Sequence, residues 1–333
     1  MLPSGNHWQI GKYSEEQVRA LIKEATANLP DRLRNPRIMI ADRRGMGGWT
    51  WLSLLWPGWQ DRKTIWITEG SLHYLEQDEI KALVLHETAH HVREYRHDIP
   101  GGWLLGDLAL FCLLFWLGAR LYLNAEGVFV IFFVVRAIVL SAAVRVLPKA
   151  AQTVEHLCDL YAAERVGAAP MVNVLLKMGE EEELVEAVLT RAARELAHVK
   201  GVEQEDLVSA FEDVRPHGRI FHDNLLRHAS QVVAKVLEGV NPSARDRSMN
   251  RKADAALKRD MNASQYRVKW RAFDDNGDSR LSDAEIRELC QALRDHPERT
   301  LFRCEGERNP ATHPSYSARV LILDAQGCFT LER

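Results

Sequence analysis

Residues 80–92 have the sequence IKALVLHETAHHV, and this stretch decides the fold. Its apolar content and the acidic residues just before it predict a helix, because negative charge stabilises a helix's first turn. Positions four apart lie on one face of a helix, so His86 and His90 can present their imidazoles to one metal ion. Glu87 follows the first histidine and can reach a water bound to that metal. The alternative is a helix with two conveniently spaced histidines, one of them packed in the core.

The third metal ligand is expected on a second helix, at Glu155. Residues 153–164 contain no helix breaker, and Glu155 and Asp159 are four apart, so both carboxylates share one face. Glu155 can complete a set of two histidines and one glutamate that leaves a fourth position for water, as in catalytic zinc sites. Asp159 can accept the ring N–H of a ligand histidine. A solvated acidic stripe is the alternative, and His156 and Cys158 are competing ligands.

The two motifs together resemble the gluzincin membrane peptidases of the HtpX type, a family that also contains the CAAX prenyl endopeptidases. The resemblance covers roughly residues 10–250. Residues 64–82 are similar to the family's strand, short helix and start of the active-site helix. The resemblance implies a zincin-like domain with one zinc ion on the two histidines and Glu155. It also implies Glu87 as the base in peptide hydrolysis, and membrane proteins or misfolded proteins as substrates.

A later feature of the family has a looser counterpart in this chain. The family's His-Pro-Pro stretch, which ends in an arginine, is matched to residues 241–247. Asn241 stands in place of the histidine, and Arg247 ends the stretch. The resemblance makes both residues candidate stabilisers of the transition state, and an asparagine amide can donate a hydrogen bond to an oxyanion.

Length, charge and cysteine content limit the class of protein. The chain has 333 residues, which favours two or three structural units over one. Its net charge is −3 and no nucleic-acid motif is visible, so we expect no nucleic-acid partner. The 5 cysteines are scattered and form no CxxC pair, which favours a reducing compartment over a disulfide framework. Residues 1–12 lack an apolar core, so no signal peptide is expected.

Two apolar runs, residues 103–118 and 127–144, lie between the metal-ligand helices. A membrane-spanning helix needs about 20 mostly apolar residues, and both runs approach that length. Each run carries one charge, Asp107 or Arg136, and the two charges could pair in a hairpin. We therefore predict a transmembrane hairpin over residues 99–146. A buried helical hairpin in a soluble core is the alternative.

The charges around the hairpin predict its orientation. Basic residues lie outside both of its ends, whereas the connecting loop, residues 121–126, has only Arg120 beside it. The positive-inside rule places both flanks, and with them the zinc helices, in the cytoplasm, which predicts an inner-membrane protein with a cytoplasmic catalytic domain. The tryptophan-rich segment 49–59 is too short to span. It predicts either contact with the bilayer interface or a strand pair under the active site.

A small sheet and several helices are expected to complete the peptidase region. Residues 37–41 and 64–68 predict strands, and a sheet with one exposed edge would let an extended substrate add as a further strand. Residues 171–240 predict amphipathic helices. The acidic run 180–183 follows Gly179 and predicts the N-terminus of a helix at that point.

Residues 274–285 match the twelve-residue calcium loop of an EF-hand, with oxygen donors at positions 1, 3, 5, 9 and 12. The candidate calcium ligands are Asp274, Asn276, Asp278, the backbone carbonyl of Arg280, Ser282 and Glu285. Ser279 stands at position 6, where a glycine normally makes the sharp turn, and no second loop is visible to pair with this one. A helix-loop-helix adaptor with a degenerate loop is the alternative.

The expected fold class is α+β and mostly helical. The expected units are an N-terminal peptidase part (1–98), a transmembrane hairpin (99–146), a C-terminal peptidase part (147–245), an EF-hand-like module (246–300) and a β-hairpin tail (301–333). The expected function is a membrane-embedded zinc endopeptidase for protein or peptide substrates, with Ca²⁺ as a candidate second cofactor and a partner protein as a candidate ligand of the module. The rival is a non-catalytic membrane sensor or scaffold in which zinc is structural and the module carries the function.

Overall fold

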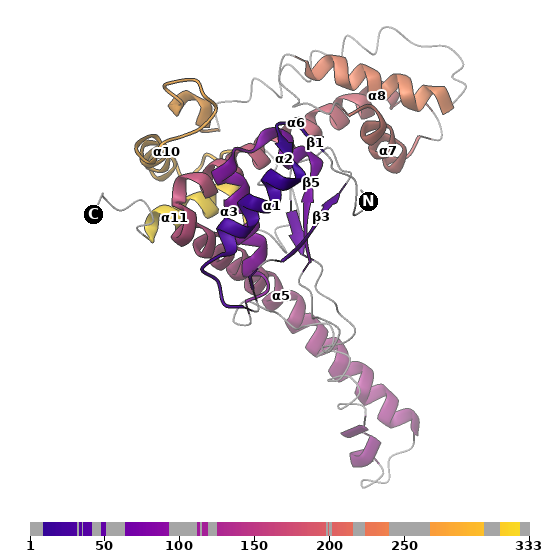
Figure 1. Cartoon of the computed structure of the whole chain (residues 1–333). Helices are drawn as coiled ribbons and strands as arrows, with labels where there is room; N and C mark the ends of the chain where they lie inside the picture. The colour runs from indigo at the N-terminus through magenta and orange to yellow at the C-terminus, as the bar shows by residue number, and fades with distance from the viewer. Residues whose placement is uncertain are drawn as a thin grey trace.

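The structure is a computed structural model. It describes residues 9–31, 33–34, 36–41, 48–50, 64–92, 112–113, 115–118, 125–197, 199, 202–215, 224–239, 267–302 and 314–326. Within these ranges the chain is mostly helical with a small sheet, which confirms the expected α+β, mostly helical class at that level (Figure 1).

The chain begins with β1 (Gln9–Ile10), β2 (Tyr13–Ser14) and α1 (Glu15–Thr26). Ser14 ends the short hairpin and caps α1. Its hydroxyl accepts the backbone N–H of Gln17, and the side chain of Gln17 accepts the backbone N–H of Ser14. This reciprocal capping satisfies two donors that a helix start leaves free. Val18 and Ile22 on the apolar face of α1 are buried, and the helix packs against α3 (Gln77–Ala89).

A three-stranded sheet follows in the order β3-β5-β4, made of β3 (Arg37–Ala41), β4 (Gly48–Thr50) and β5 (Thr64–Thr68). β3 runs parallel to β5 and β4 antiparallel to it, so both predicted strands are confirmed. Ile65 and Ile67 of the central strand are fully buried. β4 contains the first tryptophan of segment 49–59, most of which lies outside the described residues.

The helix that carries His86 and Glu87 is one of the most deeply buried elements. Thr68 caps α2 (Glu69–Tyr74), and Glu76 caps α3 (Gln77–Ala89). The backbone N–H of Glu76 donates to the carboxylate of Glu79 over 2.7 Å. Ten of the 13 residues of α3 are buried, and they are distributed over all faces of the helix. α3 packs against α1, α5 and α6. A helix buried all round belongs to a core, so the ligands it carries lie in a dry environment.

Two long helices, α5 (Ala125–Val166) and α6 (Ala168–Leu196), form the centre of the molecule. Gly167 between them has φ 92°, a conformation that L side chains rarely adopt, and this turn lets both helices pack against α3. The helix start predicted at residues 180–183 is wrong, because α6 runs through them. A Cβ at Gly179 would collide with the ring of Phe302. This glycine therefore permits close packing and does not interrupt the helix.

The next two helices have a hydrophobic core of their own. α7 (Gln204–Val214) and α8 (Leu225–Gly239) pack on the C-terminal half of α6. Val188, Phe211 and Val232 are among the residues buried there. The main core instead contains residues of α1, α2, α3 and α5, the start of α6 and the C-terminal elements. α3 and the C-terminal elements therefore share one core.

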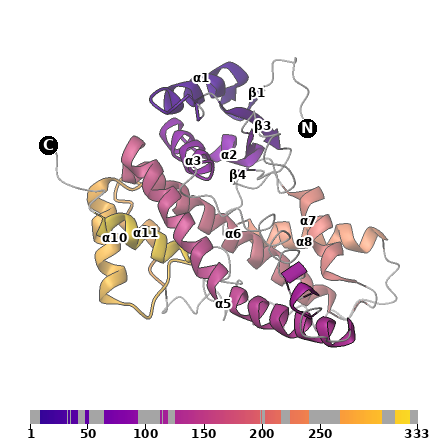
Figure 2. The same cartoon turned by 90° about the horizontal axis from the view of Figure 1, so that it is seen from below.

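The EF-hand-like module consists of η3 (Trp270–Phe273), a loop and α10 (Asp283–Asp295). Ser279 in the loop has φ 64°, so it adopts the left-handed conformation that the sequence assigned to a glycine. Leu281 and Ile286 are buried in the main core. Figure 2 shows the module across α5 and α6 from the N-terminal helices and the sheet.

The expected β-hairpin tail is wrong in the part that the structure describes. Residues 316–325 form a helix, α11 (Tyr316–Ala325), whose N-cap is Ser315. Short apolar runs such as Val320 to Leu323 do not distinguish a strand from a buried helix turn by periodicity. The tertiary structure decides in favour of the helix, because Val320 and Leu323 are both fully buried on one side of it.

The predicted hairpin over residues 99–146 is described only in part. Residues 112–113 and 115–118 are helical, Asp107 lies outside the described residues, and the second apolar run forms the N-terminal half of α5. Figure 1 shows that half projecting away from the rest of the molecule. Among the described residues, none of the helices combines the length and the apolar character that crossing a membrane requires. Large apolar side chains are exposed here: Leu113, Phe115, Trp116, Leu117, Val130, Ile131, Phe133 and Val134.

Candidate metal centre

The structure brings together the three side chains that the sequence selected as metal ligands. His86 on α3, His90 at its C-terminal end and Glu155 on α5 offer donor atoms that all lie within 4.8 Å of one another. Each histidine Nε2 lies 3.5 Å from one oxygen of the Glu155 carboxylate. Ligands at about 2.0–2.2 Å from a tetrahedral ion are about 3.4 Å apart. The group could therefore hold a small tetrahedral metal ion, and it is the only such group found among the described residues.

Asp159 lies at the other ring nitrogen of His86. Its Oδ1 is 2.9 Å from Nδ1, and the carboxylate is almost completely buried. The contact is close, although the ring N–H is not aligned with that oxygen in this structure. A carboxylate in this place keeps the proton on Nδ1 and leaves Nε2 free for a metal, which is the role the sequence assigned to Asp159.

Arg319 is the residue of the site that the sequence did not predict. It comes from α11 and donates two hydrogen bonds to Asp159, from Nε and Nη2, each 2.6 Å long. The same Nη2 lies 3.6 Å from Glu155. Arg319 is buried, so its charge offsets the two carboxylates where water cannot. The paired arginine completes a chain of contacts from α11 through Asp159 to His86.

A signal for Arg319 was present in the sequence. His313 and Pro314 precede it, so the pattern His-Pro followed by arginine occurs here as well as in the family that the chain resembles. The stretch 241–247, chosen for this role, lies outside the described residues, and with it Asn241 and Arg247. The expected β-hairpin tail left Arg319 without a predicted role.

Cys158 supports the second histidine in a different way. Its Sγ lies 3.5 Å from Nδ1 of His90, and the side chain is fully buried. Burial raises the pKa of this thiol well above its usual range, so it remains neutral. Consecutive residues of α5 thus contact the Nδ1 atoms of the two histidines, a carboxylate at His86 and a thiol at His90. The competing ligand Cys158 faces the side of His90 that is turned away from Glu155.

Charges and burial set the protonation of the ligands. Burial alone would lower the pKa of His86, but Asp159 and Glu155 outweigh it and raise the pKa to about 10. Burial, with the charge of His86, lowers the pKa of His90 to about 4. Burial would raise the pKa of Glu155, but His86 and Arg319 lower it below its usual range. Glu155 is therefore a carboxylate, and a cation must displace one proton from His86.

Glu87 is buried beside the ligand set. Only 5% of its surface is exposed. Burial is the largest influence on its carboxyl group and, with the charge of Glu155, outweighs His86 and Arg319, so that the pKa rises to about 7. A carboxyl group with such a pKa can both accept and release a proton near neutral pH. This is the property that a general base needs.

The predicted calcium ligands lie in the loop between η3 and α10, where the carboxylates accept backbone N–H groups of the loop itself. Asp274 accepts the N–H of Ser279 over 2.8 Å, and Asp278 accepts that of Arg280 over 2.8 Å. Glu285 accepts the N–H of Asp275 over 3.0 Å and caps the following helix. These hydrogen bonds order the loop from within.

No family model, no curated protein and no solved structure matches the chain. The residues themselves therefore supply the grounds for a function. Two imidazoles and one carboxylate, buried and spaced for a tetrahedral ion, form a centre that could hold a metal ion.

Proposed function

We propose that the chain is a membrane-embedded, zinc-dependent endopeptidase that hydrolyses peptide bonds in protein or peptide substrates. The observation that carries the proposal is the buried group of His86, His90 and Glu155, with Glu87 beside it. A purely structural metal site needs no such base. The likeness of the two motifs to the HtpX-type peptidases supports the same activity.

The donor set supports zinc as the metal. Two imidazoles and one carboxylate suit Zn²⁺, whereas Ca²⁺ and Mg²⁺ prefer sites made of oxygen alone. Three protein ligands leave a position for water or substrate, as catalytic zinc sites do. Asp159 and Arg319 hold the His86 ring with Nδ1 toward Asp159 and Nε2 toward Glu155, so Nε2 is placed to bind a cation that displaces its proton.

The reaction would use Glu87 as the group that moves protons. Zinc held by His86, His90 and Glu155 would supply polarisation of the substrate carbonyl and would lower the pKa of a neighbouring water. Glu87 accepts the proton of the attacking water and then delivers it to the leaving amine. In the metal-free protein burial raises the pKa of this carboxyl group to about 7, which suits a group that both accepts and releases a proton.

The decisive experiment replaces Glu87 by glutamine. The variant should bind about one zinc per chain, because Glu87 is not a ligand, and should lose casein cleavage by several orders of magnitude. Glu16→Gln, on the exposed side of α1, is the matched control and should remain fully active. Zinc content and cleavage are measured on the same preparations. An active Glu87→Gln variant would show that Glu87 is not the base. Wild-type protein that contains no zinc would show that the centre does not hold zinc.

The membrane part of the proposal rests on the apolar runs and on exposed side chains. Phe115, Trp116 and Phe133 each expose more than half of their surface, and exposed apolar surface of this extent marks contact with a partner or a membrane. Chain made in cells should resist alkaline extraction from membranes. A cysteine placed at Asn124 should react from outside the cytoplasm. Release into the soluble fraction would contradict the hairpin over residues 99–146.

We also propose that the loop 274–285 binds Ca²⁺ weakly. The left-handed conformation of Ser279 supports this, since it supplies the turn that a glycine normally makes. Calorimetry on the full chain should detect binding in about the 10⁻⁵–10⁻³ M range typical of weak loops. Glu285→Gln should abolish the heat. Binding that is unchanged in that variant, or no heat at millimolar Ca²⁺, would leave the module an adaptor.

A further inference from the structure

One face of α6 carries four polar side chains, of which three bind the C-terminal module and one, Lys177, binds α3. They lie three or four residues apart, the spacing at which residues share a helix face. This docking face consists of Asn173, Lys177, Glu180 and Glu183. Arg271 of η3 donates two hydrogen bonds to Glu180 at 2.6 and 2.8 Å, and Arg267 pairs with Glu183. The module is therefore held along α6 by its own charged residues.

The most buried of these contacts joins Asn173 to the loop. Its amide NH₂ donates to the carbonyl of Leu281 over 2.9 Å, and its amide oxygen accepts the N–H of Leu281 over 2.8 Å. Both residues are almost completely buried. A side-chain amide thus satisfies the two backbone groups that a neighbouring strand would otherwise bind. The sequence shows no second EF-hand-like loop to pair with residues 274–285. In the structure this loop instead pairs with Asn173 of α6.

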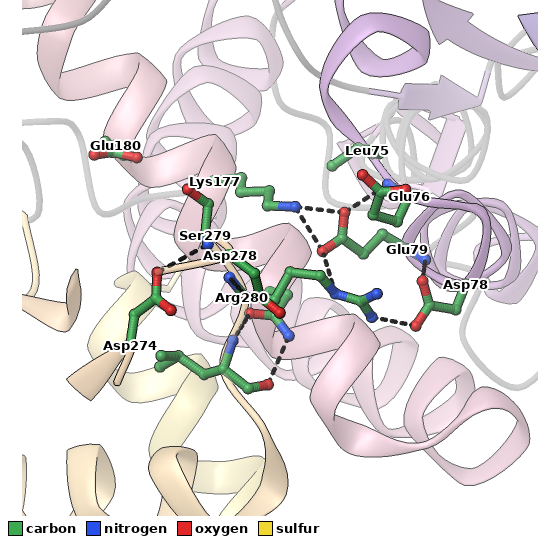
Figure 3. Close-up of polar contacts among 12 residues, drawn as sticks. Leu75, Glu76, Asp78, Glu79, Lys177, Glu180, Asp274, Asp278, Ser279 and Arg280 are labelled. Carbon is green, nitrogen blue, oxygen red and sulfur yellow. Dashed lines mark hydrogen bonds and ion pairs between the residues drawn. The ribbon is translucent and has the colours of Figure 1, made fainter. Parts of the chain in front are cut away.

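The next contact reaches the active-site helix. Lys177 donates to both oxygens of Glu79, at 2.7 Å each, and Glu79 is fully buried in the first turn of α3. Arg280, the loop residue before Leu281, pairs with Asp78 and lies 3.6 Å from Glu79. Figure 3 shows Lys177 and Arg280 approaching the start of α3 from α6 and from the loop. Glu79 is held by two cations from two different elements.

We propose that Arg280 is a positioning residue for the metal centre, and that the module acts as a clamp on α3 from within the same chain. The clamp holds the first turn of α3, and the ligands follow on the same helix. Glu79 and His86 are seven residues apart, about 10 Å along the axis. α3 is one continuous helix that carries His86 and is followed directly by His90, so a shift of its first turn would move both histidines relative to Glu155. The module thus supports zinc binding without contributing a ligand.

This inference depends on the proposed function for the identity of the metal, but its first test does not need metal. Arg280→Ala should speed amide hydrogen exchange in the first turn of α3 in metal-free protein. Arg294→Ala is the matched control, because it breaks an ion pair of similar exposure between α10 and α11. It should leave exchange in α3 unchanged. Equal exchange in wild type and Arg280→Ala would overturn the clamp even if zinc binding and peptidase activity were established.

The second test measures zinc affinity by chelator competition. Arg280→Ala should weaken binding about two- to fivefold, the effect expected of a half-exposed ion pair. Asp78→Ala should weaken binding by no more than Arg280→Ala, because Arg280 also contacts Glu79, and the double variant should lose no more than Arg280→Ala alone, because the Asp78 pair is already absent there. Asn173→Ala, which frees the buried loop, should weaken zinc further. Unchanged affinity in Arg280→Ala, or an equal loss in Arg294→Ala, would show that the module only stabilises the fold.

Discussion

Arg319 binds Asp159 with two hydrogen bonds of 2.6 Å, although 160 residues separate them in the sequence. Asp159 in turn lies 2.9 Å from the ring nitrogen of His86. The last described helix of the chain therefore helps to hold the first metal ligand. A candidate metal centre that ended at α5 would lack this support, so the C-terminal elements belong to the same structural unit as the candidate ligands.

Replacing Arg319 should reduce both stability and zinc affinity. Arg319→Met leaves a buried carboxylate without its cation, which costs about 3–5 kcal/mol. Adding Asp159→Asn removes the unpaired charge and should restore part of the stability, measured by urea unfolding of metal-free protein. Zinc affinity should be about 10–100-fold lower than in the wild type in both variants. The single variant lacks the arginine that holds Asp159, and the double variant also lacks the carboxylate that supports His86. Wild-type zinc affinity in the double variant would contradict this role.

Glu155 should be required for metal binding. Glu155→Ala removes the only oxygen donor of the group and should lose most of the zinc, measured by metal analysis after dialysis. Glu164→Ala, at an exposed site of the same helix, is the control and should keep its metal. Full occupancy in Glu155→Ala would instead assign the third ligand to His156 or Cys158.

Zinc affinity should increase with pH across the neutral range. Burial lowers the pKa of His86, but Asp159 and Glu155 outweigh it and raise the pKa to about 10, so this imidazole is protonated below that pH in metal-free protein. His90, with a pKa lowered to about 4 by burial and by His86, is already neutral. Metal binding displaces one proton, so affinity should rise about tenfold per pH unit between about pH 6 and 9.

Calorimetry in buffers of different ionisation enthalpy counts that proton. About one proton should be released at pH 7. Asp159→Asn removes the charge that raises the pKa of His86, so fewer protons should be released and the slope should flatten toward alkaline pH. No release at pH 7 in the wild type would show that His86 is neutral before the metal binds.

Cys158 should orient His90 without binding the metal. Cys158→Ala removes the group at Nδ1 and should weaken zinc binding about tenfold, whereas Cys158→Ser keeps an acceptor and should stay within about threefold of the wild type. The cobalt-substituted protein should lack the sulfur-to-cobalt charge-transfer band. Such a band in the wild type, lost in Cys158→Ala, would make Cys158 a ligand.

The sequence alone determined the ligand set and the elements that carry it. His86 and His90, or Glu155 and Asp159, meet because a helix brings positions four apart onto one face, and neighbouring residues encode that geometry locally. Strands 37–41 and 64–68 were readable for the same reason, since each is marked by its own alternating and β-branched residues.

Only the tertiary structure decided what holds these ligands in place. Residues 316–325 became a helix because one side of that run is buried, and the helix delivers Arg319 to Asp159. Asn173 binds Leu281, and Arg280 binds Asp78, although more than a hundred residues separate the two partners in each pair. No local pattern specifies such pairs. These pairs depend on how the buried helices pack against one another. A buried charge or backbone group needs a partner, and the packing decides which residue is close enough to serve.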